Sequence, residues 1–375
     1  MRTAPRKPNL LVKCRNKPMR TLPPGSTIGI FGSGQLGRML SMAAANLGYK
    51  CHIYAPDEGG VAGHVSSDYT CADYSNDEAL AAFVKSCDVI TFEFENVPVA
   101  PLRKLSQSAP IFPPKTALVI AQDRVEEKNF ARAHGGRTAS FAEVTDAASL
   151  DAAVKEIGTP LILKTVRMGY DGKGQSRIKQ GDDLTNHWGA VGEVHSIAEG
   201  FVEFTHEFSV ILVRGQDGEI RFWDTPHNVH DDGILSHSLV PAPANILNQQ
   251  DAARELARQM ADAMDYVGVL TCEFFASADG PVFNEMAPRV HNSGHWTIEG
   301  AVTSQFENHI RAICGLPLGD TSLAASRVEM DNLIGHEADE WQKLLVNDRN
   351  HLHLYGKNEV REGRKMGHVT RLFFD

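Results

Sequence analysis

Hydrophobic and polar positions alternate along the first hundred residues in segments that predict strands and helices in turn. The sequence runs through TIGIFG (apolar), GSGQLG (a Gly-rich turn), RMLSMAAANLG (a helical segment) and YKCHIYAP (apolar), with a further β-rich run, CDVITFEFE, at 87–95. Strands that alternate with helices are typical of a parallel sheet. We therefore expect an α/β domain that ends near the Pro-rich segment PIFPPKTA, which is suited to a linker.

The middle of the chain shows both helical and strand patterns. AQDRVEEKNFARAHGG and residues 146–158 read as helices, and the second of these leads to the apolar strand LILKTV. β-rich segments follow at 197–224. The helix predicted for DAARELARQMADAMDYVG carries a stripe at helical spacing, which predicts a face packed on a core: Leu256, Met260, Met264 and Val267. The last sixty residues read as short β segments.

A β-hairpin is predicted where VLTCEFFAS and PVFNEMA flank Asp279–Gly280. A two-residue turn would place Glu273 and Glu285 on opposite faces, whereas a three-residue turn with a left-handed Gly280 would place them face to face. Neighbouring carboxylates repel unless a cation lies between them, and carboxylate oxygens suit Mg²⁺. The alternative is two solvated strand acids, which the apolar neighbours Phe274, Phe275 and Phe283 disfavour.

Composition changes this picture only at the amino-terminal end. The 375 residues are 42% hydrophobic and 22% charged, as in globular proteins, and no apolar run approaches the roughly 18 residues that span a bilayer. The net charge is −10, but residues 1–20 carry seven Lys or Arg and no acid, which leaves about −17 for the remainder. Such an acidic body is a poor partner for nucleic acid or anionic membranes.

Residues 1–26 form a basic extension, read either as a transit peptide or as an upstream extension of the reading frame. We favour the second, because TLPPGS leads straight from Met19 and Arg20 into the first strand. The six cysteines show no CxxC and no zinc spacing, which fits a reducing cytosol.

Two Gly-rich segments are candidates for phosphate binding. Gly32-x-Gly34-x-x-Gly37 follows a strand and opens a helix, with Asp57 twenty residues on, as in the dinucleotide fingerprint. The alternative to dinucleotide binding is a tight turn between strand and helix that has no ligand. The second segment, 169–175, follows Lys164 at the end of an apolar strand. It suits a flap whose amides approach phosphate oxygens beside a lysine, or a Gly-rich hairpin with a surface lysine. GxxxxGK[ST] is absent.

Two further segments carry candidate chemistry. In PRVHNSGHW, Arg289 beside a carboxylate pair is placed to hold a small anion, and we read His291 and His295 as structural or substrate-contact residues rather than metal ligands. In KNEVREGRKMGH, four basic residues fall within nine positions, with glycines between them. A solvated face and a phosphate clamp are equally good readings of this run.

Seven blocks in order along the chain resemble N5-carboxyaminoimidazole ribonucleotide synthases of the ATP-grasp superfamily: GSGQLGRML, TFEFENV, QDRVEEK, LKTVRMGYDGKGQ, HNVHDDGIL, NEMAPRVHNSGHW and GRKMGH. The resemblance runs from about Thr27 to His368. It implies a Rossmann-like parallel-sheet domain at 27–118, an ATP-grasp α+β domain at 119–316 and a small β-rich domain at 317–375. The chain ends seven residues after GRKMGH, where the family usually continues, so we expect a shortened last domain.

The resemblance also implies roles for individual residues. ATP would be held by Arg124, Lys128, Lys164, Gly169, Tyr170, Asp171, Gly172, Lys173, Gly174, Gln175, Glu199, Gly200, Phe201, Val202, Glu207, His230, Asn284 and Glu285. The aminoimidazole ribonucleotide would meet Gly34, Gln35, Leu36, Glu95, Tyr170, Asp171, His291, Lys357 and Arg364. Glu273 and Glu285 would bind Mg²⁺. Lys164, Arg289 and Asp171 would be catalytic, with Arg289 on bicarbonate and Asp171 as the proton acceptor.

The implied activity is that of a ligase in purine biosynthesis. It would carboxylate 5-aminoimidazole ribonucleotide with ATP and bicarbonate, through carboxyphosphate, and release ADP and phosphate. Relatives of this kind are cytoplasmic homodimers that act on small molecules. The rival classes are a biotin carboxylase, an NAD-dependent dehydrogenase and a non-catalytic nucleotide-binding regulator. Nothing downstream of the fingerprint offers a hydride-transfer site, and the set Lys164, Glu273, Glu285 and Arg289 speaks against the regulator.

Overall fold

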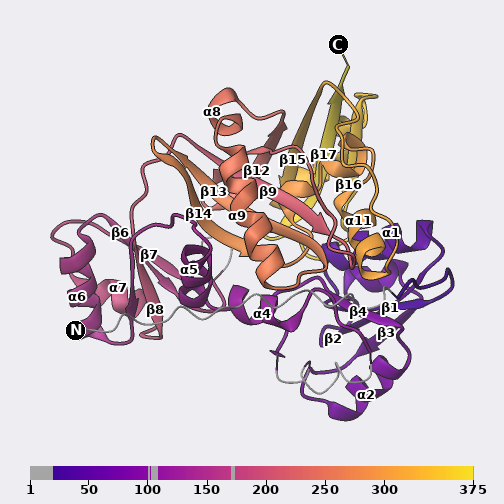
Figure 1. Cartoon of the computed structure of the whole chain (residues 1–375), viewed down its shortest axis with the longest axis horizontal. Coiled ribbons are helices and arrows are strands. Elements are labelled where there is room, and N and C mark those ends of the chain that lie inside the picture. Colours follow the sequence, from indigo (N-terminus) through magenta and orange to yellow (C-terminus); the bar gives the residue numbers. More distant parts are fainter. Residues whose placement is uncertain (1–19, 100–101, 103–108, 170–173, 375) are drawn as a thin grey trace, which may run out of the picture.

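The computed structural model describes residues 20–99, 102, 109–169 and 174–374. Within these ranges the chain forms three sheets with helices packed around them (Figure 1). Two predicted features lie outside the described residues: positions 1–19 of the basic extension, and the flap residues Tyr170, Asp171, Gly172 and Lys173.

The amino-terminal domain is built on a parallel sheet of strand order β3-β2-β1-β4. Its elements are β1 (Thr27–Phe31), α1 (Gln35–Asn46), β2 (Lys50–Ala55), η1 (Val61–Val65), β3 (Asp68–Cys71), α2 (Asp77–Lys85) and β4 (Val89–Phe92). The alternation predicted from the apolar runs is confirmed. β4 is shorter than the run predicted at 87–95, because the chain leaves the strand where its polar residues begin.

The helix predicted within 121–136 is confirmed, but the Pro-rich segment before it, predicted as a linker, runs into a further helix that was not predicted. The structure has two helices, α4 (Lys115–Ala121) and α5 (Arg124–Ala133). The break between them lies at Asp123, whose side chain accepts hydrogen bonds from the amides of Val125 and Glu126 and so caps α5. The end of the Pro-rich segment already belongs to α4.

A second, antiparallel sheet of order β5-β8-β6-β7 forms a separate lobe, at the left of Figure 1. Its elements are β5 (Phe141–Val144), α6 (Ala147–Ile157), β6 (Leu161–Thr165), β7 (Gln175–Ile178), α7 (Leu184–Ala190) and β8 (Ser196–Gly200). Leu150, Leu161, Leu163 and Trp188 are among the residues of its own small core.

The third sheet is nine-stranded, in the order β14-β13-β9-β11-β12-β15-β17-β16, with β10 paired to β9. Its strands are β9 (His206–Arg214), β10 (Ile220–Phe222), β11 (His227–Asp231), β12 (Ile234–Val240), β13 (Gly268–Ser277), β14 (Gly280–Ala287), β15 (Arg327–Ile334), β16 (Asn350–Leu354) and β17 (Lys365–Phe373). The helices that accompany it are α8 (Ala244–Leu247), α9 (Gln250–Ala263), η2 (Asn292–Gly294), α10 (Thr297–Gly300), α11 (Gln305–Ile313), η3 (Gly335–Glu340) and α12 (Trp341–Leu344). Because β12 pairs with β15, the carboxy-terminal strands continue the same sheet.

Helices cover both faces of this sheet. The predicted stripe is confirmed in part: Leu256 and Met260 are buried on α9 and belong to one core with Leu212 and Leu270. α9 ends at Ala263, so Val267 lies beyond the helix and belongs to a different core. The alternate residues of β9, such as Ile211, belong with α11 to a core on the other face, and this core extends to α1 of the first domain. No helix within the described ranges combines the length and the apolarity that crossing a membrane requires.

Candidate functional site

A cavity of about 560 Å³ lies where the amino-terminal domain, the β13–β14 hairpin and the carboxy-terminal strands meet. It brings together the predicted residues Gly34, Gln35, Leu36, Glu95, Arg124, Gly169, Glu285, Arg289, His291, Lys357 and Arg364. A second cavity, of about 550 Å³, shares Gly34, Lys357 and Arg364 with the first. The basic carboxy-terminal run therefore faces the Gly-rich turn after β1, which favours the phosphate clamp over the solvated face.

Arg289 is fixed in the wall of this cavity. Its Nε donates to the carboxylate of Glu95, and its Nη1 donates to the carbonyl of Val290 at 3.1 Å. Burial alone would raise the pKa of Glu95, but the charge and hydrogen bond of Arg289 lower it below the ordinary value. Glu95 is therefore ionised and holds the guanidinium where it can meet an anion in the cavity.

The β13–β14 hairpin pairs Glu273 with Glu285. Ser277 pairs with Gly280, so the turn has two residues, and the expectation that such a turn puts the two acids on opposite faces is wrong. The register shifts at Asn284, an extra residue between the pairs Phe274–Phe283 and Glu273–Glu285. The bulge also presents the carbonyl of Asn284 to Lys128 Nζ, at 3.0 Å. One inserted residue thus restores the facing of the two acids.

The two acids differ in charge state. Burial, and next the charge of Glu285, raise the pKa of Glu273 to about 7. Burial opposes ionisation of Glu285 too, but Arg124, whose Nη1 lies 2.9 Å from Glu285 Oε2, lowers its pKa below the ordinary value. The charge of Glu285 raises the pKa of Glu273 because two neighbouring carboxylates repel each other.

Glu273 and Glu285 fit the needs of Mg²⁺. This ion typically takes one or two carboxylates together with substrate phosphates. Among the described residues, no group of three or more His, Cys, Asp or Glu is arranged to hold a metal unaided. Phosphate oxygens would therefore have to complete the coordination.

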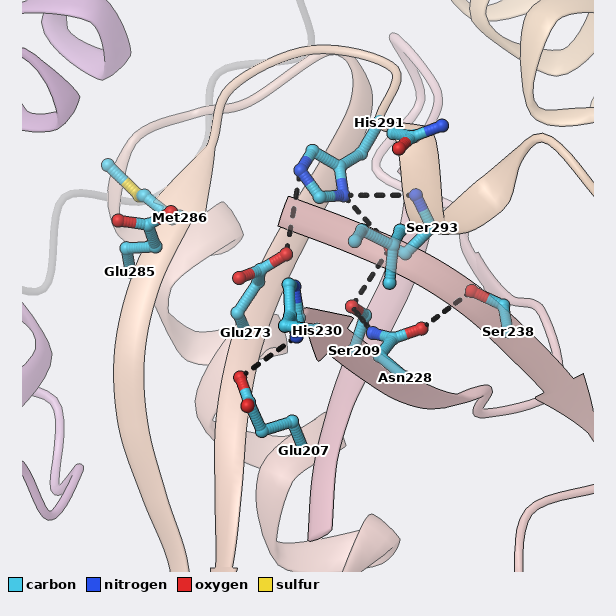
Figure 2. A network of polar contacts seen from close by, with 12 residues as sticks. Glu207, Ser209, Asn228, His230, Ser238, Glu273, Glu285, Met286, His291 and Ser293 are labelled. Carbon is cyan, nitrogen blue, oxygen red and sulfur yellow. Dashed lines mark hydrogen bonds and ion pairs between the residues drawn. The ribbon is translucent and has the colours of Figure 1, made fainter. Parts of the chain in front are cut away.

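A chain of polar contacts continues from Glu273 across the sheet (Figure 2). His291 Nε2 lies 3.5 Å from Glu273 Oε1, and His291 Nδ1 lies 2.9 Å from Ser293 Oγ. Burial, and then the charge of Arg289, lower the pKa of His291 well below its ordinary value, so its ring is neutral. On the other side of Glu273 in Figure 2, His230 Nδ1 lies 3.1 Å from Glu207 Oε2.

A second charged group lies between α5 and the lobe. Glu199 is buried between two lysines, with Oε1 at 3.1 Å from Lys128 Nζ and Oε2 at 2.9 Å from Lys164 Nζ. Burial opposes ionisation, but the two lysine charges lower the pKa of Glu199 to about 2. The side chain of Glu199 is thus committed to the lysines, so a contact with adenine at this position would have to come from its main chain.

Most of the predicted residues fall into three groups. The first lines the larger cavity, the second surrounds Glu199, and the third consists of Glu207, His230 and Glu273; the second and third lie outside the cavity lining. α5 connects the first two, because Arg124 binds Glu285 and Lys128 binds both Glu199 and the bulge carbonyl. Arg124 Nη2 also donates to the carbonyl of Gly169 at 3.1 Å, which ties the start of the predicted flap to the hairpin.

The Gly-rich turn after β1 does not have the free amides of a dinucleotide site. Glu93, which follows β4, accepts hydrogen bonds from the amides of Gly34 (2.6 Å) and Gly37 (2.9 Å). Burial raises the pKa of Glu93, while these amides and the charges of Arg289 and Lys357 act in the opposite direction. Two of the donors that a pyrophosphate would use are occupied, which argues against the dehydrogenase.

Among the acidic residues of the cavity wall, sequence reasoning missed Glu93, Glu127 and Glu362. Glu127 accepts from the amide of Met286 at 2.6 Å, and burial, followed by the charge of Glu285, raises its pKa to about 8. Glu93 stands two positions before Glu95 in TFEFENV, and Glu127 stands beside Lys128 in QDRVEEK. The motifs contained both acids, but their partners are distant in sequence, so no local pattern separated them from ordinary surface acids.

Comparisons with known proteins agree with this geometry. The ribonucleotide synthetase preATP-grasp domain family matches residues 25–122, the ATP-grasp domain family matches 129–306, and the phosphoribosylaminoimidazole carboxylase C-terminal domain family matches 329–373. The N5-carboxyaminoimidazole ribonucleotide synthase of Brucella melitensis is 48% identical over 94% of this chain and 98% of its own length.

Two solved structures share the whole architecture. The N5-carboxyaminoimidazole ribonucleotide synthetase of Thermus thermophilus is 43% identical, with a TM-score of 0.85 over 92% of this chain and 93% of its own. The Aspergillus clavatus enzyme, solved with ADP and 5-aminoimidazole ribonucleotide, is 30% identical, with a TM-score of 0.85 over 93% and 94%. Identity at this level over nearly the full length of both chains settles the kinship: this chain belongs to the N5-carboxyaminoimidazole ribonucleotide synthase family of ATP-grasp ligases.

Proposed function

We propose that this chain carboxylates the exocyclic amine of 5-aminoimidazole ribonucleotide, with ATP and bicarbonate as co-substrates and carboxyphosphate as the intermediate. The observation that carries the proposal is the larger cavity, which places Arg289 and Glu285 opposite the basic residues Lys357 and Arg364. An anion-binding guanidinium, a carboxylate suited to a metal and a phosphate-binding wall are the parts that such a ligation needs in one place.

The nucleotide would lie between the lobe and the hairpin. Lys164 and Lys128, which Glu199 holds together, and Arg124 would meet the phosphates of ATP. Mg²⁺ bound by Glu273 and Glu285 would neutralise charge on the phosphate oxygens. The main chain of 199–202 would face adenine, with Glu207 at the ribose and His230 nearby; the remaining predicted contacts are Gly169, Gly174, Gln175 and Asn284.

Bicarbonate would be held by Arg289. It is a weak nucleophile, so the barrier must fall through positioning and charge neutralisation. Because Glu95 fixes the guanidinium, no rearrangement is needed when the anion arrives. Attack on the γ-phosphorus would give carboxyphosphate and ADP. Carboxyphosphate hydrolyses readily, so closure of the segment 169–175 to exclude water is part of the proposal.

The ribonucleotide would approach from the amino-terminal side, along Gly34, Gln35, Leu36, Glu95 and His291, with its phosphate at Lys357 and Arg364. Its amine nitrogen would form a bond to the carboxyl carbon while the carbon–oxygen bond to phosphate breaks. Tyr170 and Asp171, which we propose as a contact and as the proton acceptor, lie outside the described residues. We also propose that the protein acts in the cytoplasm as a homodimer.

ADP release with Mg²⁺ and bicarbonate, measured with and without the ribonucleotide, tests the proposed function. Stimulation by the ribonucleotide is the expected result. ATP binding without any stimulation would mean that another molecule accepts the carboxyl group. With bicarbonate labelled by ¹⁸O, transfer of one labelled oxygen to the released phosphate tests the carboxyphosphate step, and unlabelled phosphate would contradict it.

A further inference from the structure

The carboxylate of Glu93 is bound at the amino-terminal end of α1. The amino-terminal cap of α1 is Gly34, which provides no side-chain cap, and the first turn carries no acid. Glu93 supplies the missing acceptor from the end of another element, with one oxygen on the amide of Gly34 and the other on that of Gly37. It therefore stands where the helix dipole favours a negative charge.

The Glu93 side chain leaves no room for a Cβ at two glycines of the turn, Gly32 and Gly34. A Cβ added to Gly32 would lie 2.6 Å from Glu93 Cγ, and one added to Gly34 would lie 2.8 Å from Glu93 Oε1. At Gly37 the corresponding distance to Glu93 Cγ is 3.4 Å. In a dinucleotide site the same glycines let the backbone approach a pyrophosphate. Here a carboxylate of the protein takes the place of that phosphate.

Glu93 also lies between the two cavities, since it lines both of them. Across from it, Lys357, Arg361 and Arg364 line both cavities as well. A ribonucleotide in this space meets Glu93 on one wall and these three basic residues on the other, where Arg361 is paired with Glu359. The turn amides bound by Glu93 are not available to its phosphate, which the basic residues attract.

We propose that Glu93 is a positioning and specificity-determining residue: it occupies the phosphate-binding amides of the Gly-rich turn and thereby fixes the orientation of the ribonucleotide, with the phosphate on the basic wall. This inference rests on the proposed function for the identity of the ribonucleotide. The exclusion of phosphate from the turn rests on the contacts of Glu93 alone and can be tested separately.

Glu93→Gln is the principal variant, and Glu78→Gln is the matched control. Glutamine keeps the length of the side chain, but one terminal atom becomes an NH₂ group that confronts an amide instead of accepting from it. Glu78 is an exposed acid of the same domain and lies outside both cavities. We expect Glu93→Gln to raise the KM for the ribonucleotide by about tenfold or more, equivalent to about 1.4 kcal/mol, with the KM for ATP unchanged. Glu78→Gln should leave both constants unchanged.

Gly34→Ala provides a second variant, because its added methyl group displaces the Glu93 carboxylate without changing the charge. In the double variant, the increase in the KM for the ribonucleotide should be much smaller than the product of the increases in the two single variants, since both substitutions act through one contact. A KM for the ribonucleotide that stays at the wild-type value in folded Glu93→Gln would overturn the proposal. So would equal increases in both KM values, which would indicate general structural damage.

Binding of inorganic phosphate separates this inference from the proposed function. Thermal unfolding with increasing phosphate should show greater stabilisation of Glu93→Gln than of the wild type, since one amide of the turn loses its acceptor and becomes available. This phosphate test is valid even if the wild type shows no ribonucleotide-stimulated ADP release. Such a result would contradict the proposed function but not the role of Glu93. Equal stabilisation of the two proteins would contradict the role of Glu93.

Discussion

Glu285 is the residue on which the proposed metal site most depends, because Arg124 lowers its pKa while the pKa of Glu273 is raised to about 7. Glu285→Gln should lower kcat by about 100-fold or more, the size of effect seen when one electrostatic group is removed from an active site. The fold should survive, since the Glu285 side chain is 41% exposed. Steady-state ADP release measures kcat, and thermal unfolding measures whether the fold survives.

Glu219→Gln is the matched control for this variant. Glu219 is also paired with an arginine, Arg221, at 2.7 Å, and its side chain is also 41% exposed, but it lies outside both cavities. Its activity should equal that of the wild type. Wild-type activity in Glu285→Gln would remove Glu285 from the metal site.

A separate prediction concerns the contribution of Glu199 to the stability of the folded state. Its pKa is about 2 in the folded protein against an ordinary value of 4.5. A depressed carboxylate pKa stabilises the folded state fully above the unfolded value, and this stability is lost as the pH falls from about 4.5 to about 2. The difference corresponds to roughly 3 kcal/mol.

Glu199→Gln should therefore unfold in urea with a free energy lower by roughly 3 kcal/mol at neutral pH. The gap from the wild type should narrow below pH 4.5, where the wild type loses the same contribution. Glu203→Gln, at an exposed neighbouring position, should show no such gap. A gap that is independent of pH would mean that the lysines do not hold Glu199 ionised.

At the scale of elements, the loop between β6 and β7 depends on its last glycine. Gly174 has φ +70°, and an added Cβ would lie 2.8 Å from Thr165 Oγ1. Its carbonyl accepts from the amide of Thr165 at 2.8 Å, next to Lys164. Gly174→Ala should cost roughly 1 kcal/mol of stability and should raise the KM for ATP, with the KM for the ribonucleotide unchanged.

Gly189→Ala in α7 is the matched control, because an added Cβ there meets nothing within 4 Å and the residue is helical. It should leave both KM values unchanged and stabilise the lobe by up to about 1 kcal/mol through helix propensity. If Gly174→Ala behaved like this control, the loop would not take part in nucleotide binding.

Local patterns predicted the elements well where one physical preference decided them. The βαβ alternation and the buried face of α9 at Leu256 and Met260 follow from periodicity. The pairing of Glu273 with Glu285 across a two-residue turn was not predicted, because a bulge at Asn284 restores it and nothing in the residue types marks a bulge. α4 was not predicted, because its residues follow directly on the prolines that indicated a linker.

At the scale of the whole molecule, the cavity exists only because segments some 330 residues apart meet. The motifs indicated which residues carry chemistry, and Gly34, Glu95, Arg289 and Lys357 do line one cavity. The partners of Glu93 and Glu199 are distant in sequence: Gly34 and Gly37 follow the strand β1 beside β4, Lys164 lies on the strand β6 beside β8, and Lys128 comes from α5. No local pattern in the sequence marks these contacts.

The basic wall supplies the prediction that belongs to this scale. Arg364 lines both cavities. The substitution Arg364→Ala should raise the KM for the ribonucleotide by at least about tenfold, because a charged hydrogen bond to phosphate is lost. The KM for ATP should stay the same. Arg349→Ala, at an exposed position of the same carboxy-terminal segment, is the control. Equal effects of Arg364→Ala on both substrates would place the ribonucleotide phosphate elsewhere.

The most direct test of the central claim is the stoichiometry of carboxyl transfer. The chain is incubated with ATP, Mg²⁺, ¹³C-labelled bicarbonate and 5-aminoimidazole ribonucleotide, and ¹³C NMR follows the carbamate carbon while ADP is measured in the same sample. We predict one labelled carboxyl group on the ribonucleotide for each ADP released. ADP release without a labelled carbamate, under conditions in which the product is stable, would contradict the account.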